Sequence, residues 1–113
     1  MSGFDEMQRL SEITERAHQD FEARSRARDE ALANARQLTR HAANTIRAIH
    51  RDESELAEEL LSQARALVET MKRNLEPFPS LYYAGYTQDA IKEFVEASIT
   101  CALIRQQALP APE

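Results

Sequence analysis

Apolar side chains recur every three or four residues along most of this chain, a spacing that places them on one face of an α-helix. From about residue 4 to residue 51 the pattern comes as two runs, Phe4, Met7, Leu10, Ile13, Ala17 and Phe21, and then Ala31, Ala35, Leu38, Ala42, Thr45, Ile46 and Ile49. Between the runs Arg24 and Arg28 stand where apolar residues are expected. Either the helix breaks there or its middle portion is solvated. So many alanines in a long helix are typical of close packing against other helices, often from another chain.

Two further helices follow in the pattern, over residues 53–75 and 81–107. Asp52 and Glu55 have the spacing of a capping box, so we expect Asp52 to cap the second helix. The run Glu76-Pro77-Phe78-Pro79 ends it, because proline lacks an N–H and disfavours helix in the residue before it. So short a connection predicts that the two helices lie antiparallel. The expected apolar faces are Leu56, Leu60, Ala64, Leu67, Met71 and Leu75 in the second helix, and Ile91, Phe94, Val95, Ile99, Cys101 and Ala102 in the third.

Composition supports an all-α fold. The chain has only two glycines, and all four prolines lie beyond residue 76, whereas a sheet protein needs turn residues at short intervals. Its 113 residues suffice for one domain, and 42% of them are hydrophobic, enough for a shared core. We therefore predict a single domain over residues 1–113, an antiparallel bundle of about three long helices.

The net charge, the cysteine content and the lack of a targeting or membrane-spanning pattern indicate which classes of protein the chain can belong to. A formal net charge of −5 argues against coating nucleic acid by total charge, although a local basic stripe can suffice. Cys101 is the only cysteine, which favours a reducing compartment. The sequence shows neither a signal-peptide pattern nor the ~18 apolar residues of a membrane span. We expect a cytoplasmic protein without membrane contacts.

Three acids of the third helix, Asp89, Glu93 and Glu96, share one side with Thr100, at ~100° of rotation per residue. Like charges at i, i+3 and i, i+4 repel by a few tenths of a kcal/mol each. A hard cation such as Mg²⁺ would relieve this repulsion, because it takes one or two protein carboxylates and keeps several waters. The alternative is a solvated acidic face, the commonest fate of glutamates on helices. Both interpretations stay open.

The first helix carries a basic counterpart. Arg36, Arg40, Arg47 and Arg51 fall within ~60° of one another and would span ~22 Å, enough to follow several phosphates. The alternative is an ordinary solvated face, with or without pairing to the acidic run of residues 52–55.

The remaining candidate residues give weaker indications of a functional site. Tyr82, Tyr83 and Tyr86 would either stack on bases or pack the start of the third helix against its neighbour. The histidines lack ligand spacing, Cys101 is expected to be a buried thiol, and no glycine-rich phosphate loop occurs.

Residues 81–90, Leu-Tyr-Tyr-Ala-Gly-Tyr-Thr-Gln-Asp-Ala, followed by Lys92-Glu93-Phe94-Val95-Glu96-Ala97, resemble the central helix of the translin family. The Glu-aromatic-Val-Glu-Ala run is similar to that of the TRAX-like members. This resemblance implies an all-α fold, homo-oligomeric shells and binding of single-stranded RNA or DNA. It also implies a Mg²⁺- or Mn²⁺-dependent endoribonuclease in which Glu93 and Glu96 are catalytic metal ligands. Asp89 joins them as a metal ligand from the helical wheel alone.

Family members are about twice as long, and their second half supplies a further catalytic aspartate. The resemblance thus implies that this chain corresponds to an N-terminal half with part of a metal site. The alternative function is a non-catalytic module that binds single-stranded RNA or DNA through Arg36, Arg40, Arg47 and Arg51, or that serves as a helical oligomerisation module.

Overall fold

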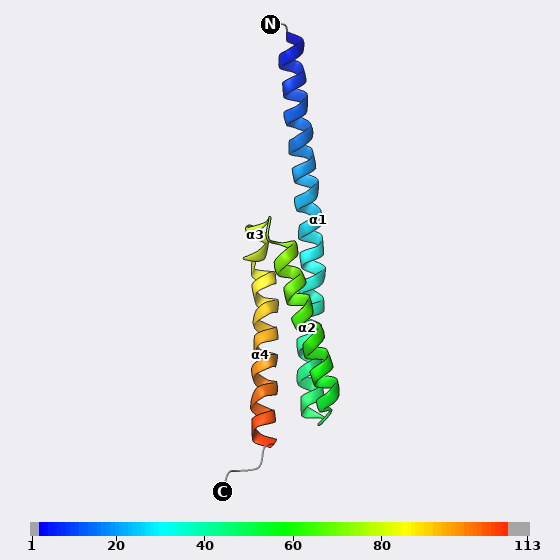
Figure 1. Cartoon of the computed structure of the whole chain (residues 1–113), viewed down its shortest axis with the longest axis vertical. Helices are drawn as coiled ribbons and strands as arrows, with labels where there is room; N and C mark the ends of the chain where they lie inside the picture. Colours follow the sequence, from blue (N-terminus) through cyan, green and yellow to red (C-terminus); the bar gives the residue numbers. More distant parts are fainter. Residues whose placement is uncertain (1–2, 109–113) are drawn as a thin grey trace.

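A computed structural model describes residues 3–108, all of them in helices or in the short connections between helices. The helices are α1 (Gly3–His50), α2 (Ser54–Asn74), α3 (Pro79–Tyr82) and α4 (Gly85–Ala108). Figure 1 shows α1 running the length of the molecule, α2 returning antiparallel to it, and α4 running in the same direction as α1. The predicted all-α bundle is confirmed, and so is the antiparallel arrangement of the second and third long helices.

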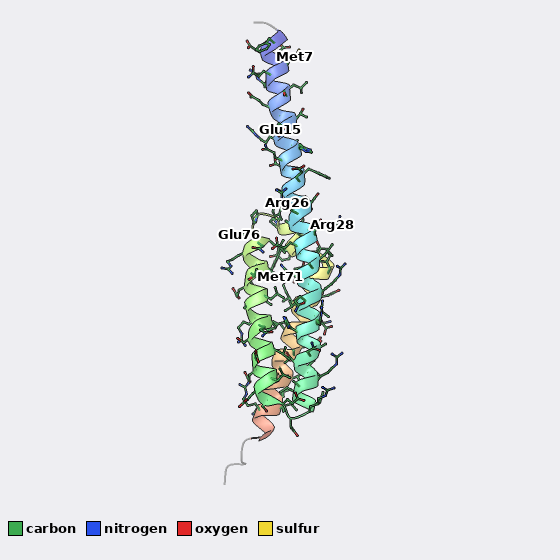
Figure 2. The ribbon with its side chains drawn as sticks, turned by 90° about the vertical axis from the view of Figure 1, so that its right-hand side faces the viewer. Met7, Glu15, Arg26, Arg28, Met71 and Glu76 are labelled. Atoms are coloured by element: carbon green, nitrogen blue, oxygen red, sulfur yellow. The ribbon has the colours of Figure 1, made fainter. Side chains whose placement is uncertain are left out.

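The first helix is unbroken through Arg24 and Arg28, and both arginines are exposed, so the solvated alternative holds. The Arg24 guanidinium donates a hydrogen bond of 2.9 Å to Ser80 Oγ, at the start of α3. Every residue from 3 to 22 is exposed. We call this stretch the arm. Figure 2 shows its side chains, Met7 and Glu15 among them, projecting from a helix that no other element surrounds.

The core is formed where α2 and α4 pack against the C-terminal half of α1. Leu38 and Met71 are fully buried between the three long helices. Small residues occupy most of the remaining buried positions, among them Ala35, Ala64 and Ala97. Alanine at a contact lets two helix backbones approach closely, which explains why both α2 and α4 are held mainly by α1.

The predicted apolar face of α2 is partly wrong: Ala64, Met71 and Leu75 are buried as expected, but the other three positions are shifted by one residue. Leu56 is 42% exposed, whereas the neighbouring Ala57 and Leu61 are buried. Leu60 and Leu67 lie at the edge of the core. The buried set is Ala57, Leu61, Ala64, Val68, Met71 and Leu75.

The predicted apolar face of α4 is partly wrong as well. Val95 and Ile99 are exposed, and so is Ala102, while Cys101 is buried as expected. The face that meets α1 consists of small residues, Thr87, Ala90, Ala97 and Cys101, with Ile91 and Phe94 at its border. Close packing against α1 selects small side chains there and leaves the larger ones on the adjoining surface.

The connection between α1 and α2 does not use the predicted capping box. The N-cap of α2 is Glu53, and no side chain caps the helix. Asp52 instead has a φ of 60°, a left-handed conformation. The Asp52 N–H donates to the Ile49 carbonyl and the Glu53 N–H to the Ala48 carbonyl, the pair of bonds that defines a Schellman motif at a helix C-terminus.

The predicted third helix, residues 81–107, is divided at Tyr83 and Ala84. Thr87 is fully buried, and its hydroxyl donates a 2.9 Å hydrogen bond to the Leu81 carbonyl across the break. Gln88 Nε2 donates likewise to the Tyr82 carbonyl at 2.8 Å. These bonds satisfy carbonyls at the end of α3 and fix the direction in which α4 leaves. No helix in residues 3–108 is long and apolar enough to cross a membrane.

Candidate functional site

The three acids singled out by the sequence lie on one exposed side of α4. Asp89, Glu93 and Glu96 are all exposed, and they lie beside the face of α4 that packs on α1. Leu103, two turns beyond Glu96, is 54% exposed. Nothing within the described part of this chain covers the acids, so they are solvated carboxylates in the single chain.

Asp89 and Glu93 also border a groove between α1 and α4. The groove has a volume of about 410 Å³ and an apolar floor formed by Leu32, Ala35, Tyr86 and Ala90. Arg36 of α1 stands on the opposite rim. We call this feature the α1–α4 groove. It exists because α1 and α4 run parallel, which brings the basic side of one helix beside the acidic side of the other.

Among residues 3–108, no group of three or more His, Cys, Asp or Glu side chains is placed to hold an ion. Glu93 and Glu96 are successive acids one helical turn apart and both exposed. Two such carboxylates suit a Mg²⁺ ion that keeps most of its waters, because Mg²⁺ in proteins is commonly held by one or two carboxylates.

All four predicted arginines of the basic stripe are exposed. Arg36, Arg40 and Arg47 belong to α1, and Arg51 lies in the turn directly after it. Within the described residues none of the four forms an ion pair, so pairing with the acids of residues 52–55 is not observed. Arg47 Nη1 donates to Asn44 Oδ1 at 2.6 Å, which leaves its remaining donors to solvent. We call these four side chains the arginine face.

The tyrosines divide between two roles. Tyr82 and Tyr86 pack against the cluster of Ala31, Leu75 and Leu81, as the packing interpretation expects. Tyr83 is 71% exposed and meets Tyr82 edge to face, with 5.0 Å between ring centroids. One aromatic ring at the start of α4 is thus free for another molecule.

The remaining candidates have ordinary local partners. His18 Nε2 lies 3.0 Å from Glu22 Oε1 on the arm, and His41 Nε2 lies 3.0 Å from Gln37 Nε2. Cys101 is buried, and burial raises the pKa of its thiol above the ordinary value of 9.0. A buried thiol of this kind is structural rather than reactive.

Sequence reasoning missed two features of the site. One is the proximity of Arg36 to Asp89 and Glu93, which depends on the parallel course of α1 and α4. The other is the hydroxyl of Tyr86, which is buried at the groove floor and finds no hydrogen-bond partner in the described part of the chain. When three long helices alternate in direction, the first and the third run parallel. The predicted topology therefore indicated that the first and third helices could lie side by side.

The chain was compared with protein-family models, with curated proteins and with solved structures, and none of the three comparisons found a match. The resemblance to the translin family therefore remains a prediction from residues 81–97.

Proposed function

We propose that this chain binds single-stranded RNA or DNA through the arginine face. The observation that supports the proposal is the exposure of all four guanidinium groups without an ion pair in residues 3–108. Guanidinium groups suit phosphates because their planar donors bind two oxygens at once. From Arg36 to Arg51 the face extends ~22 Å along the helix. The sequence resemblance to the translin family points to the same class of ligand.

The chain binds by local charge, because its net charge is −5. Phosphate binding releases counterions, so log K falls with log salt by about 0.7 for each phosphate neutralised on a single strand. Four contacts predict a slope of about −3 for the intact arginine face. The exposed ring of Tyr83 offers a base-stacking contact at the other end of the bundle.

The test measures binding of a fluorescent oligouridine and the matching oligothymidine by anisotropy at several salt concentrations. Arg40→Gln combined with Arg47→Gln removes half of the arginine face, so we expect weaker binding and a slope reduced by about 1.4. Arg105→Gln is the matched control, since Arg105 is an exposed arginine of α4 that pairs with Glu58. An unchanged affinity and slope in the double variant would show that the arginine face is only a solvated surface.

A second candidate function is metal-dependent cleavage of the bound strand. The α1–α4 groove favours it, because Arg36 and the acids Asp89 and Glu93 line one depression. Glu93 and Glu96 would hold a hydrated Mg²⁺ or Mn²⁺ ion, and Asp89 is the third candidate ligand. When bound, such an ion supplies an activated water and stabilises charge on the phosphate. Arg36 would bind a neighbouring phosphate oxygen and orient the backbone beside the carboxylates.

Two measurements test the second candidate. Mn²⁺ binding followed by electron paramagnetic resonance should weaken in Glu93→Gln and Glu96→Gln, and less in Asp89→Asn. Cleavage of single-stranded RNA in Mg²⁺ should stop with chelator and in both glutamine variants. Cleavage that persists in both variants, or no cleavage by the unaltered chain, contradicts the assignment while leaving binding through the arginine face intact.

A further inference from the structure

The arm carries an apolar stripe that nothing in the described residues 3–108 covers. Phe4 is 70% exposed, Met7 73%, Leu10 64% and Phe21 69%. At ~100° per residue, Met7, Leu10 and Phe21 share one side of α1 with Ala17, whereas Phe4 and Ile13 lie on opposite flanks of that side. A stretch of about 20 helical residues is marginal in water by itself, and a continuous exposed apolar patch marks an interaction surface.

The arm stripe is continuous in register with the buried stripe of the same helix. Steps of three and four residues alternate from Met7 through Leu10, Thr14, Ala17 and Phe21 to Ala31, Ala35, Leu38, Ala42 and Thr45. The last five are buried between α2 and α4. A helix face with this seven-residue repeat fits other helices, so the occupant of the arm stripe is a helical surface.

The distribution of charge along α1 indicates which helical surface binds the arm stripe. Residues 3–22 contain six acids and two arginines, a net charge of −4, whereas residues 23–50 contain six arginines and two acids, a net charge of +4. In an antiparallel pair of α1 helices, the acidic arm of each copy lies beside the basic half of the other. In a parallel pair, or in a pair that joins only the two arms, the arm with net charge −4 would lie beside the equally charged arm of the other copy, and the two would repel.

The α1–α4 groove is the helical surface on that basic half. Its apolar floor lies open on the bundle, with Arg36 on the α1 rim and Asp89 and Glu93 on the α4 rim. The arm has a matching asymmetry about its stripe. One flank carries Glu15 and Glu22, and the other carries both of its arginines, Arg9 and Arg16, beside Glu6 and Asp20, at ~100° per residue.

From these observations we propose that two copies of the chain pair antiparallel, with the arm of each in the α1–α4 groove of the other. Only in this direction does the Glu15 and Glu22 flank meet the Arg36 rim while Arg9 and Arg16 meet the α4 acids. Centred near Ser25, the pairing lays residues 3–22 of one copy along residues 28–47 of the other. The arm, ~30 Å long, then ends where the bundle of its partner ends.

The contact is large enough for a stable dimer. At about 100 Å² for each of the six large apolar side chains on two arms (Met7, Leu10 and Phe21 of each copy), the arms alone bury about 600 Å², and the two grooves contribute a similar area. Specific dimers bury about 1,200–2,000 Å² in total. Arg51 lies beyond the paired residues 28–47, so the dimer leaves this member of the arginine face open.

Sedimentation equilibrium of the full chain gives the first test. We expect a dimer whose dissociation constant rises at least roughly 100-fold in Leu10→Glu, which places two carboxylates in two grooves per dimer. Leu56→Glu is the matched control, because Leu56 is an exposed leucine of α2 away from the groove, and it should remain dimeric. Circular dichroism checks that both variants fold. A monomeric unaltered chain, or equal loss in both variants, overturns the proposal.

Disulfide formation between copies tests the direction, in a Cys101→Ala background. Ser25→Cys lies at the proposed centre and should cross-link, whereas Thr14→Cys positions lie more than ~30 Å apart across the dimer and should not. Cross-linking at both positions would indicate parallel helices. Cross-linking at Thr14→Cys alone would indicate two arms packed on each other. Either result overturns the arm-in-groove arrangement.

Discussion

Leu38 and Leu10 lie on the same stripe of α1, and the same substitution at the two positions should have very different effects. Leu38 is fully buried among Ala35, Ala64 and Met71, all contributed by packed helices. Truncating a buried leucine to alanine costs 2–5 kcal/mol, the lost transfer energy plus the cavity. Of the three neighbours named, only Met71 has a side chain long enough to move into the space, so we expect about 3 kcal/mol.

Urea denaturation followed by circular dichroism measures this cost. With a slope of about 1.5 kcal/mol per molar, Leu38→Ala should lower the midpoint by roughly 2 M at every protein concentration. Leu10, at 64% exposure, makes no such contact within its chain, so Leu10→Ala should leave the midpoint unchanged in dilute protein. Its effect should appear only at concentrations where copies associate. A loss in dilute Leu10→Ala comparable with that of Leu38→Ala would refute the exposed position of the arm.

Three further predictions concern the connections and the thiol. Asp52→Gly should raise the free energy of unfolding by up to about 1 kcal/mol, because glycine adopts the left-handed φ of 60° without strain, and Asp52→Ala should lower it. Thr87→Val should cost about 1 kcal/mol in the same assay through loss of the hydrogen bond to the Leu81 carbonyl, and retention of full stability would argue against that bond. Burial raises the pKa of Cys101 above 9.0, so the unfolded chain loses this proton first and stability should fall as pH rises above about 9. Below that pH the thiol contributes no slope, and Cys101→Ala should flatten the alkaline fall.

The sequence was sufficient to predict the helices but not their inward faces. Missing turn residues and three-to-four-residue spacing placed the long helices within a few residues of their observed ends. The predicted faces of α2 and α4 are partly wrong because the largest apolar residues of these helices are not the most buried ones. In the structure, Ala57 and Ala97 are buried while Leu56 and Ile99 are exposed, since close helix contacts favour small side chains. The hydrophobic pattern of one helix does not indicate the distance between that helix and the helix packed against it.

Hydrogen bonds that side chains form across a turn also could not be predicted from the spacing of residues in the sequence. The break at Tyr83 and Ala84 depends on Thr87 bonding back to Leu81, six residues away in the sequence. Asp52 shows the same limit: its spacing to Glu55 matched a capping box, yet its backbone ends α1. The predicted arginines and acids are exposed, which a helical wheel can indicate without knowledge of packing, and their roles stay predictions. Their meeting at the α1–α4 groove needed the parallel course of two helices.

The continuity of α1 from the arm into the bundle has a consequence for how the arm forms. Starting a helix is the unfavourable step, since the first turn fixes several residues for one hydrogen bond, whereas extending an existing helix adds one bond per residue. The buried half of α1 supplies that first turn, so the arm grows outward from the bundle and frays from Gly3 inward. Amide exchange should therefore be graded along one helix, slowest near Leu38 and fastest at the tip.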